Sequence, residues 1–207
     1  MYSSYFDGSA IYGNSETKAN SLRTFSGGLL KTSDGITASK VGVTNRTYLP
    51  LSSDICSVSN LTHCFSAGEH RTSENLGLVS VQTLFNREHN RIAAKIAANN
   101  TSWSDEYIYQ ETRRIIIAIL QHIVYNEWLP AVTGNSTLSP LSTSEYYSGY
   151  DSSVNPAIAN DFAASAFRFG HSLIIDDLFR YNAKSSRIGG GSFGIQNCIF
   201  KTDYAYK

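Results

Sequence analysis

The sequence predicts a mainly α-helical fold, and two long amphipathic segments are the main reason. Residues 73–98 place apolar side chains three or four positions apart without a proline, and residues 105–129 repeat the pattern. Such spacing gathers the apolar side chains on one side of a helix. A third signal is Asn155-Pro156, a capping residue followed by proline at the first helical position. A chain of 207 residues is also long enough to enclose a hydrophobic core.

The N-terminal part is expected to be less regular. Residues 1–12 are interpreted as a tight loop around Asp7, and a short helix is expected from about Ser15 to Phe25. Residues 28–70 are rich in Ser, Thr and Gly. They are expected to form a long connection that carries function, because structureless loops of this size are unusual in compact domains.

The long helices have definable ends and faces. Asp105 and Glu106 favour a helix N-terminus at the start of the second one. Pro130 is expected to end it. The apolar positions of the first helix are Leu76, Val79, Leu84, Ile92 and Ile96. Those of the second, together with one histidine, are Ile108, Ile115, Ile119, His122, Ile123 and Trp128. After the third helix, which leads to His171, residues 192–207 have no clear periodicity.

Composition limits the possible partners. Lys plus Arg and Asp plus Glu are 17 each, so no net field favours nucleic acid or an anionic membrane. The longest aliphatic run, Ile115 to Leu120, is too short to span a bilayer, so no membrane span is expected. The N-terminus lacks the basic and apolar regions of a signal peptide.

Other features are typical of extracellular proteins. Cys56 and Cys64 lie eight residues apart in a polar segment, a spacing that a local disulfide closes and that would leave Cys198 unpaired. Two reduced thiols are the alternative. Acceptors of the type Asn-x-Ser/Thr occur at Asn45, Asn60, Asn99, Asn100 and Asn135. An extracellular body without an export signal suggests a missing N-terminus.

Five motifs carry a more specific signal. They are Ser-Ser-Tyr-Phe-Asp-Gly-Ser-Ala-Ile-Tyr-Gly at 3–13, Phe-Ser-Ala-Gly-Glu-His-Arg-Thr-Ser-Glu at 65–74, Asn-Arg-Glu-His-Asn-Arg-Ile-Ala at 86–93, the helix with Trp-Leu-Pro at 120–134, and Phe-Arg-Phe-Gly-His-Ser-Leu-Ile at 167–174. In their order and spacing they resemble the animal haem peroxidases, the superfamily that includes myeloperoxidase and peroxidasin. The resemblance covers nearly the whole chain.

The resemblance assigns roles to three side chains. His171 would be the axial ligand of the haem iron, pushing electron density toward the O–O bond. Arg71 would stabilise charge on the leaving oxygen, a role typically worth ~2.7–4 kcal/mol. Glu74 would be the carboxylate esterified to haem b. Gly170 fits a backbone that approaches the porphyrin closely. Asn75 stands where myeloperoxidase has a methionine linked to haem, so that sulfonium link is not expected.

A calcium site is also implied. Ser3, Asp7 and Ser9, with the backbone carbonyl of Tyr5, would supply the oxygen ligands that calcium prefers. An ordinary turn around Asp7 is the alternative. The family takes a further calcium ligand from the segment that holds its distal histidine, which would lie before Met1.

The remaining histidines are given no catalytic role. His89 and His122 lie on helices where the family has no distal histidine, and His63 and His70 lie in the connecting segment. No His-Glu-x-x-His, paired Cys-x-x-Cys or Gly-x-Ser-x-Gly motif is present, and Gly189–Gly191 lacks the spacing of a phosphate loop.

The implied function is a peroxidase that uses hydrogen peroxide to oxidise halide, thiocyanate or phenolic donors, in response to oxidative stress. Residues 1–207 would be a partial catalytic domain with the animal haem peroxidase fold. It would lack the distal-histidine segment and the C-terminal helices, and so have little activity alone. The parent protein would be extracellular; its oligomeric state is left open. The alternative is a non-catalytic extracellular binding or matrix module derived from a peroxidase.

Overall fold

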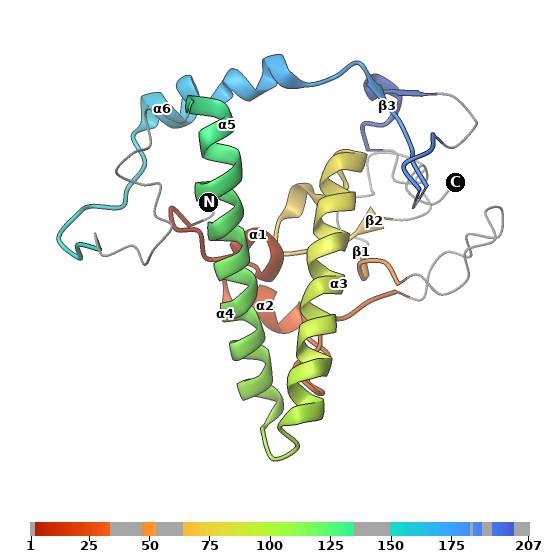
Figure 1. The fold of residues 1–207 in the computed structure, drawn as a ribbon, viewed down its shortest axis with the longest axis vertical. Coiled ribbons are helices and arrows are strands. Elements are labelled where there is room, and N and C mark those ends of the chain that lie inside the picture. Colours follow the sequence, from red (N-terminus) through yellow and green to blue (C-terminus); the bar gives the residue numbers. More distant parts are fainter. Residues whose placement is uncertain are drawn as a thin grey trace.

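The computed structural model describes residues 3–33, 47–52, 64–134, 150–182, 184–187 and 192–200. Figure 1 shows two long helices, α3 and α4, side by side and joined by a short turn at one end of the molecule. The small helices α1 and α2 pack beside them, and a mostly helical strap crosses the opposite end of this hairpin (Figure 1). The predicted mainly helical class is confirmed.

The described elements are mostly helices, and the short strands form two pairs, one before α3 and one near the C-terminus. The α-helices are α1 (Ser9–Tyr12), α2 (Glu16–Leu22), α3 (Leu76–Asn99), α4 (Asp105–Ile123), α5 (Leu129–Thr133) and α6 (Asn160–Ala164). The 3-10 turns are η2 (His70–Ser73), η5 (Ala166–Leu173) and η6 (Ile195–Asn197), and η3 (Val124–Trp128) is π-helical. The strands are β1 (Leu51–Ser52), β2 (Cys64–Phe65), β3 (Asp177–Leu178) and β4 (Phe193–Gly194). β1 pairs antiparallel with β2, and β3 with β4.

Side-chain caps fix where three helices begin. Ser15 accepts a hydrogen bond from the Lys18 amide, Asn75 from the Leu78 amide, and Ser104 from the Tyr107 amide. Asn75 therefore has a local structural role. Because it caps α3, that helix begins at Leu76 rather than at residue 73.

Three further boundaries differ from the sequence prediction. Residues 9–12 form α1 inside the predicted loop. The second long helix continues through Pro130 to Thr133, because the π-helical turn before the proline changes the hydrogen-bond register. Asn155 accepts a hydrogen bond from the Ala157 amide instead of capping a long helix, and helical structure starts only at Asn160.

The main core lies between α1, α2, α3 and α4. Its buried members are Ile11, Tyr12, Leu22, Leu30, Tyr109 and Ile116. A second cluster of Leu49, Phe65, Ala67 and Val79 holds the small β1–β2 sheet against α3. Among the predicted apolar positions, Val79 and Ile108 are buried, whereas Leu84 and Trp128 are 63% and 42% exposed.

Polar side chains of α3 fasten the N-terminal segments. Gln82 donates to the Ala10 carbonyl and Asn86 to the Lys31 carbonyl. Asn90 accepts from the Leu30 amide and donates to the Leu30 carbonyl. Buried backbone groups need such partners. The inner face of α3 is therefore partly polar, which explains why its apolar pattern is irregular.

Gly68 lies where no side chain fits. A Cβ at this position would overlap the Gly13 amide nitrogen, the Ser9 carbonyl oxygen and the Ile11 carbonyl carbon. All three are backbone atoms, which cannot move away cheaply. Gly68→Ala is therefore expected to lower the free energy of unfolding by about 1–3 kcal/mol, as overpacking does. Urea unfolding would measure it. Gly77→Ala is the control, since its Cβ would meet only the Asn75 side chain; equal losses would contradict the argument.

Large parts of α4 and of the strap are exposed. Asp105–Thr133 is one continuous helical stretch of 29 residues, long and apolar enough to cross a membrane by length and composition alone. Only 6% of its apolar window is buried. The expectation of no membrane span rested on the short aliphatic run, and this helix does not support that reasoning.

Candidate functional site

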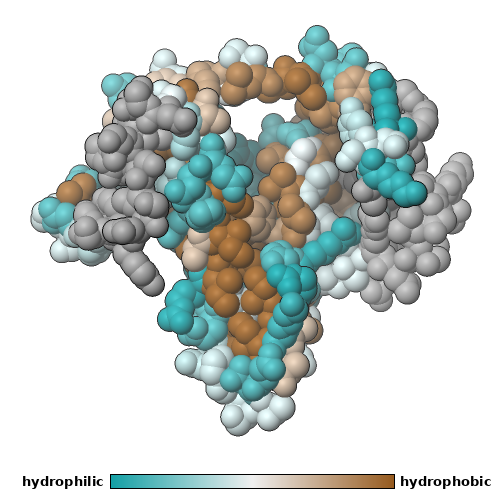
Figure 2. Space-filling view, in the orientation of Figure 1, coloured by the Kyte–Doolittle hydropathy of each residue, from teal (hydrophilic) through white to brown (hydrophobic). Residues whose placement is uncertain are grey.

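His171 lies on the strap, residues 158–175, which bridges the far end of the hairpin. Its imidazole is exposed, and none of the described residues forms a hydrogen bond with it. The strap also exposes Phe162, Phe167, Phe169 and Leu173 by 41–64%. Figure 2 shows the strap as a largely apolar band above an opening between it and the rest of the molecule. A Cβ at Gly170 would meet no atom of the described chain, so the chain itself does not require glycine there.

Arg71 lies on η2, directly before α3. Its Nε and Nη2 donate to the two Glu69 carboxylate oxygens at 2.8 and 3.0 Å, a forked ion pair. The Arg71 side chain is 54% exposed and that of Glu69 only 11%. Glu69 also accepts from the Arg71 amide, so it caps the 3-10 turn. The distal-arginine candidate is therefore held in place by a residue that the sequence analysis did not single out.

Glu74 lies between Arg71 and the first turn of α3. It is half-buried, and no described residue donates a hydrogen bond to its carboxylate. Its backbone carbonyl accepts from the Phe200 amide at 2.8 Å, so the C-terminal segment contacts the chain at this position. A carboxylate without a local partner is chemically suited to bind an external group.

The three candidates come from two segments at the same end of the hairpin. In Figure 1 the strap with η5 passes over the end at which α3 begins, directly after Arg71 and Glu74. Arg71 and Glu74 belong to the body of the molecule, and His171 belongs to the strap. His171 and the two distal candidates therefore belong to different parts of the fold.

The predicted calcium loop is compact around Asp7. One Asp7 oxygen accepts from the Ser9 amide at 2.9 Å, and the Tyr5 amide donates to the Ser3 hydroxyl at 3.1 Å. Partial burial works to raise the pKa of Asp7. Hydrogen bonds from Ser9 and Ser3 outweigh it and hold the pKa below the usual 3.8.

The donor chemistry fits calcium only in part. Asp7 is ionised at neutral pH, but Ser9 is buried and its hydroxyl is engaged with Asp7. Calcium takes 6–8 oxygen ligands, more than Ser3, Tyr5, Asp7 and Ser9 supply. Among the residues that the structure describes, no group of three or more His, Cys, Asp or Glu could hold a metal ion.

His89 is fully buried and serves the core. Its Nε2 lies 2.8 Å from the Gly28 carbonyl oxygen, and its Nδ1 lies 2.8 Å from the Tyr12 hydroxyl. Because a carbonyl only accepts, Nε2 carries the proton and Nδ1 accepts from Tyr12. Burial lowers the pKa of His89 to about 4, and Arg23 adds to the effect. The expectation that His89 has no distal role agrees with these contacts.

The cysteines and remaining histidines are only partly described. Cys64 takes part in a disulfide bond, while its predicted partner Cys56, like His63, lies outside the described residues. Cys198 is buried. His70 is exposed beside Glu69, and His122 lies next to Asn126 on the outer part of α4.

The residues present are compatible with haem in their chemistry. The chain supplies an exposed imidazole beside exposed apolar side chains on the strap, a carboxylate to which no described residue donates a hydrogen bond, and an arginine. The sequence matches the animal haem peroxidase family over residues 1–207. The chain belongs to this family. Membership of this family implies haem binding.

Comparisons with individual relatives support this family assignment. The chain is 42% identical to "Peroxidasin homolog pxn-2" of Caenorhabditis elegans over 209 residues, 97% of this chain and 15% of the relative. It is 37% identical to "Peroxinectin A" of Dictyostelium discoideum, with 89% and 33% of the two chains covered. The solved structure of peroxidase A from Dictyostelium discoideum superposes with a TM-score of 0.77 and 32% identity, covering 97% of this chain and 37% of that one. The chain thus spans well under half the length of these relatives.

Proposed function

We propose that residues 1–207 form the part of a haem peroxidase catalytic domain that supplies the iron ligand and the distal arginine. The whole protein would use hydrogen peroxide to oxidise halide, thiocyanate or phenolic donors, in response to oxidative stress. The observation that carries the proposal is the placement of Arg71 and Glu74 at the end of α3 over which the His171 strap passes. Bound haem supplies the redox chemistry with peroxide.

The chain's own residues would bind the haem and orient the peroxide. His171 offers an unpaired imidazole nitrogen to the iron, and Glu74 offers a carboxylate for an ester with the porphyrin. Arg71, held by the forked ion pair with Glu69, would donate to a peroxide oxygen. Ser3, Tyr5, Asp7 and Ser9 would contribute to a calcium site that needs further ligands from elsewhere.

Haem titration of the chain tests the iron ligand. Wild-type protein is expected to bind haem with a Soret band typical of imidazole ligation. His171→Ala is expected to lose that band, because no other described histidine lies on the strap. His122→Ala, which removes an exposed imidazole from α4, is the matched control. An unchanged spectrum in His171→Ala would exclude the assignment.

A second variant tests the covalent link. In haem-loaded protein turned over with peroxide, part of the haem is expected to resist extraction by acidified organic solvent. Glu74→Gln is expected to release nearly all of it, because an amide cannot form the ester under these conditions. Glu127→Gln on η3, which removes an exposed carboxylate, serves as the control. Equal release from the wild type and Glu74→Gln would reject the ester.

A non-catalytic extracellular module derived from a peroxidase is the second candidate. The exposed apolar side chains of the strap support it, because in the described part of the chain the segment that carries His171 is open to solvent. Absence of any Soret band in the wild-type titration would favour this alternative. For either candidate we propose an extracellular location, supported by the disulfide of Cys64.

A further inference from the structure

The turn between α3 and α4 lies at the end of the hairpin that points away from the strap (Figure 1). We call residues 99–104 the hairpin tip. It contains Asn99-Asn100-Thr101-Ser102, in which two glycan acceptors overlap. Asn99 uses Thr101 as its third residue and Asn100 uses Ser102. Two bulky glycans on adjacent side chains would collide, so the tip has room for one.

The backbone and the side chain of Asn100 form the hydrogen bonds that close the turn between α3 and α4. It is the C-cap of α3 and half-buried, and its amide donates to the Ala97 carbonyl. Its carbonyl accepts from the Trp103 amide at 3.0 Å, and its side-chain Nδ2 donates to the Ile96 carbonyl at 3.0 Å. A glycan on Asn100 would have to be placed beside a half-buried side chain whose backbone holds both sides of the turn.

Asn99 is freer. Its side chain is exposed on the last turn of α3, and its one recorded side-chain hydrogen bond runs from Nδ2 to the Lys95 carbonyl at 3.0 Å. A glycosylated amide keeps one N–H, so this bond can persist after modification. Thr101 and Ser102 are both exposed as well. The folded hairpin therefore accommodates a glycan on Asn99 without rearrangement.

We propose that the hairpin tip is an N-glycosylation site and that the glycan is attached to Asn99, not to Asn100. The Asn99 Nδ2 forms a bond to the anomeric carbon of the sugar, the bond from that carbon to the pyrophosphate of a lipid-linked donor breaks, and one amide proton leaves. The inference rests on the proposed extracellular location, because the donor is met only in the secretory route.

The position is compatible with the proposed chemistry. A glycan at the tip lies at the opposite end of the hairpin from the strap and η2 (Figure 1). It also lies close in sequence to the Trp103–Tyr107 ring pair, whose centroids are 4.4 Å apart and whose tyrosine is 50% exposed. The glycan would shield this aromatic surface from self-association and leave the candidate site open.

Peptide mapping tests the proposal. The full chain would be expressed behind a cleavable secretion leader in a glycosylating host, and digested with trypsin after Lys95 and Arg113. The peptide 96–113 contains both asparagines. Enzymatic glycan release in ¹⁸O water converts the modified asparagine to labelled aspartate, which fragment spectra locate. Chains retained in the endoplasmic reticulum, where the glycan is added, are mapped in the same way.

Two variants separate the acceptors while both asparagines stay in place. Thr101→Ala is expected to remove the label from the peptide 96–113 almost completely, and Ser102→Ala is expected to leave its occupancy at Asn99 unchanged. A label on residue 100, or its loss in Ser102→Ala, would overturn the choice of Asn99. An unlabelled tip beside a labelled Asn135 peptide would overturn the site. Because the added leader directs the chain into the secretory route, neither outcome bears on the native location. Detection of the natural protein in the medium tests that location separately.

Discussion

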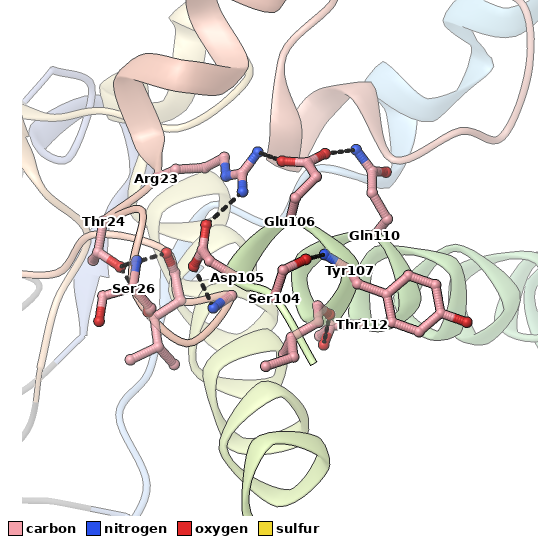
Figure 3. A network of polar contacts seen from close by, with 12 residues as sticks. Arg23, Thr24, Ser26, Ser104, Asp105, Glu106, Tyr107, Gln110 and Thr112 are labelled. Atoms are coloured by element: carbon pink, nitrogen blue, oxygen red, sulfur yellow. Dashed lines mark hydrogen bonds and ion pairs between the residues drawn. The ribbon is translucent and has the colours of Figure 1, made fainter. Parts of the chain in front are cut away.

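Replacing Arg23 by methionine is expected to lower the free energy of unfolding by about 3 kcal/mol, the lower end of the cost of breaking a buried ion pair. Arg23 connects the end of α2 to the first turn of α4. Its Nη2 donates to Asp105 at 2.8 Å and its Nη1 to Glu106, as Figure 3 shows. The Arg23 side chain is 5% exposed, so water cannot replace these bonds.

Methionine would keep much of the apolar contact and remove the charge. The guanidinium also stacks on the Tyr109 ring, with its central carbon 3.9 Å from the centroid, and that contact would be lost. Asp105 would keep only the Gly28 amide as a hydrogen-bond donor among the contacts described for it. Glu106 suffers less, because it is 58% exposed and retains Gln110. This solvent access places the expected loss at the lower end of the range.

The matched control is Arg114→Met on α4, the helix that carries Asp105 and Glu106. Arg114 pairs with Glu111 at 2.5 Å, but its side chain is 77% exposed. Exposed pairs contribute only ~0.2–1 kcal/mol, so this variant should stay close to the wild type. Urea unfolding followed by circular dichroism measures both. If the two variants lose the same stability, Arg23 is not the fastening point between α2 and α4.

The sequence patterns predicted the existence of α3 and α4 more accurately than the positions at which the helices begin and end. The apolar periodicity of residues 73–98 and the acidic start at Asp105 correspond to α3 and α4. The ends depended on contacts that no spacing reveals. Pro130 does not stop its helix because a π turn precedes it, and Asn155 closes a local turn with Ala157. Ile115 on α4 and Trp128 on η3 are exposed because none of the described residues covers them.

The candidate site was predictable only where residue types carry the chemistry. Arg71, Glu74 and His171 could be named from their motifs. Their partners could not: the fork from Arg71 to Glu69 depends on the 3-10 turn of η2, which brings residues two positions apart together. The role of His89 likewise depends on Tyr12 and Gly28, which are 77 and 61 positions away. In the sequence His89 was only one residue of the motif at 86–93, and its buried hydrogen bonds become visible only in the fold.

His89 should make the fold sensitive to mild acid. Its pKa is about 4 in the folded chain, below the usual 6.5, chiefly because burial penalises the charged ring. Between these values the unfolded chain binds more protons than the folded one, so falling pH favours unfolding. The stability linked to His89 is complete above about pH 6.5 and is lost as the pH falls to about 4. The difference corresponds to about 3 kcal/mol.

The described groups around His89 would not stabilise the positive charge of a protonated imidazole. The Tyr12 and Tyr109 rings pack against the imidazole, with centroids 5.4 and 5.7 Å away, and Arg23 lies near enough to oppose a second positive charge. Burial also raises the pKa of Tyr12 above its usual 10, so the phenol stays neutral and offers no counter-charge. A proton on Nδ1 would have to displace the hydrogen bond that Tyr12 donates.

Urea unfolding at several pH values between 4 and 7 measures this loss, and NMR titration of the imidazole locates it. His89→Gln is expected to be less stable at pH 7 but to lose little further stability toward pH 4. His122→Gln, which removes an exposed imidazole from α4, should keep the wild-type pH dependence. If His89→Gln retains the full slope between pH 4 and 7, His89 is not the source of the acid sensitivity. In that case the buried Tyr12–His89–Gly28 chain acts through its hydrogen bonds alone.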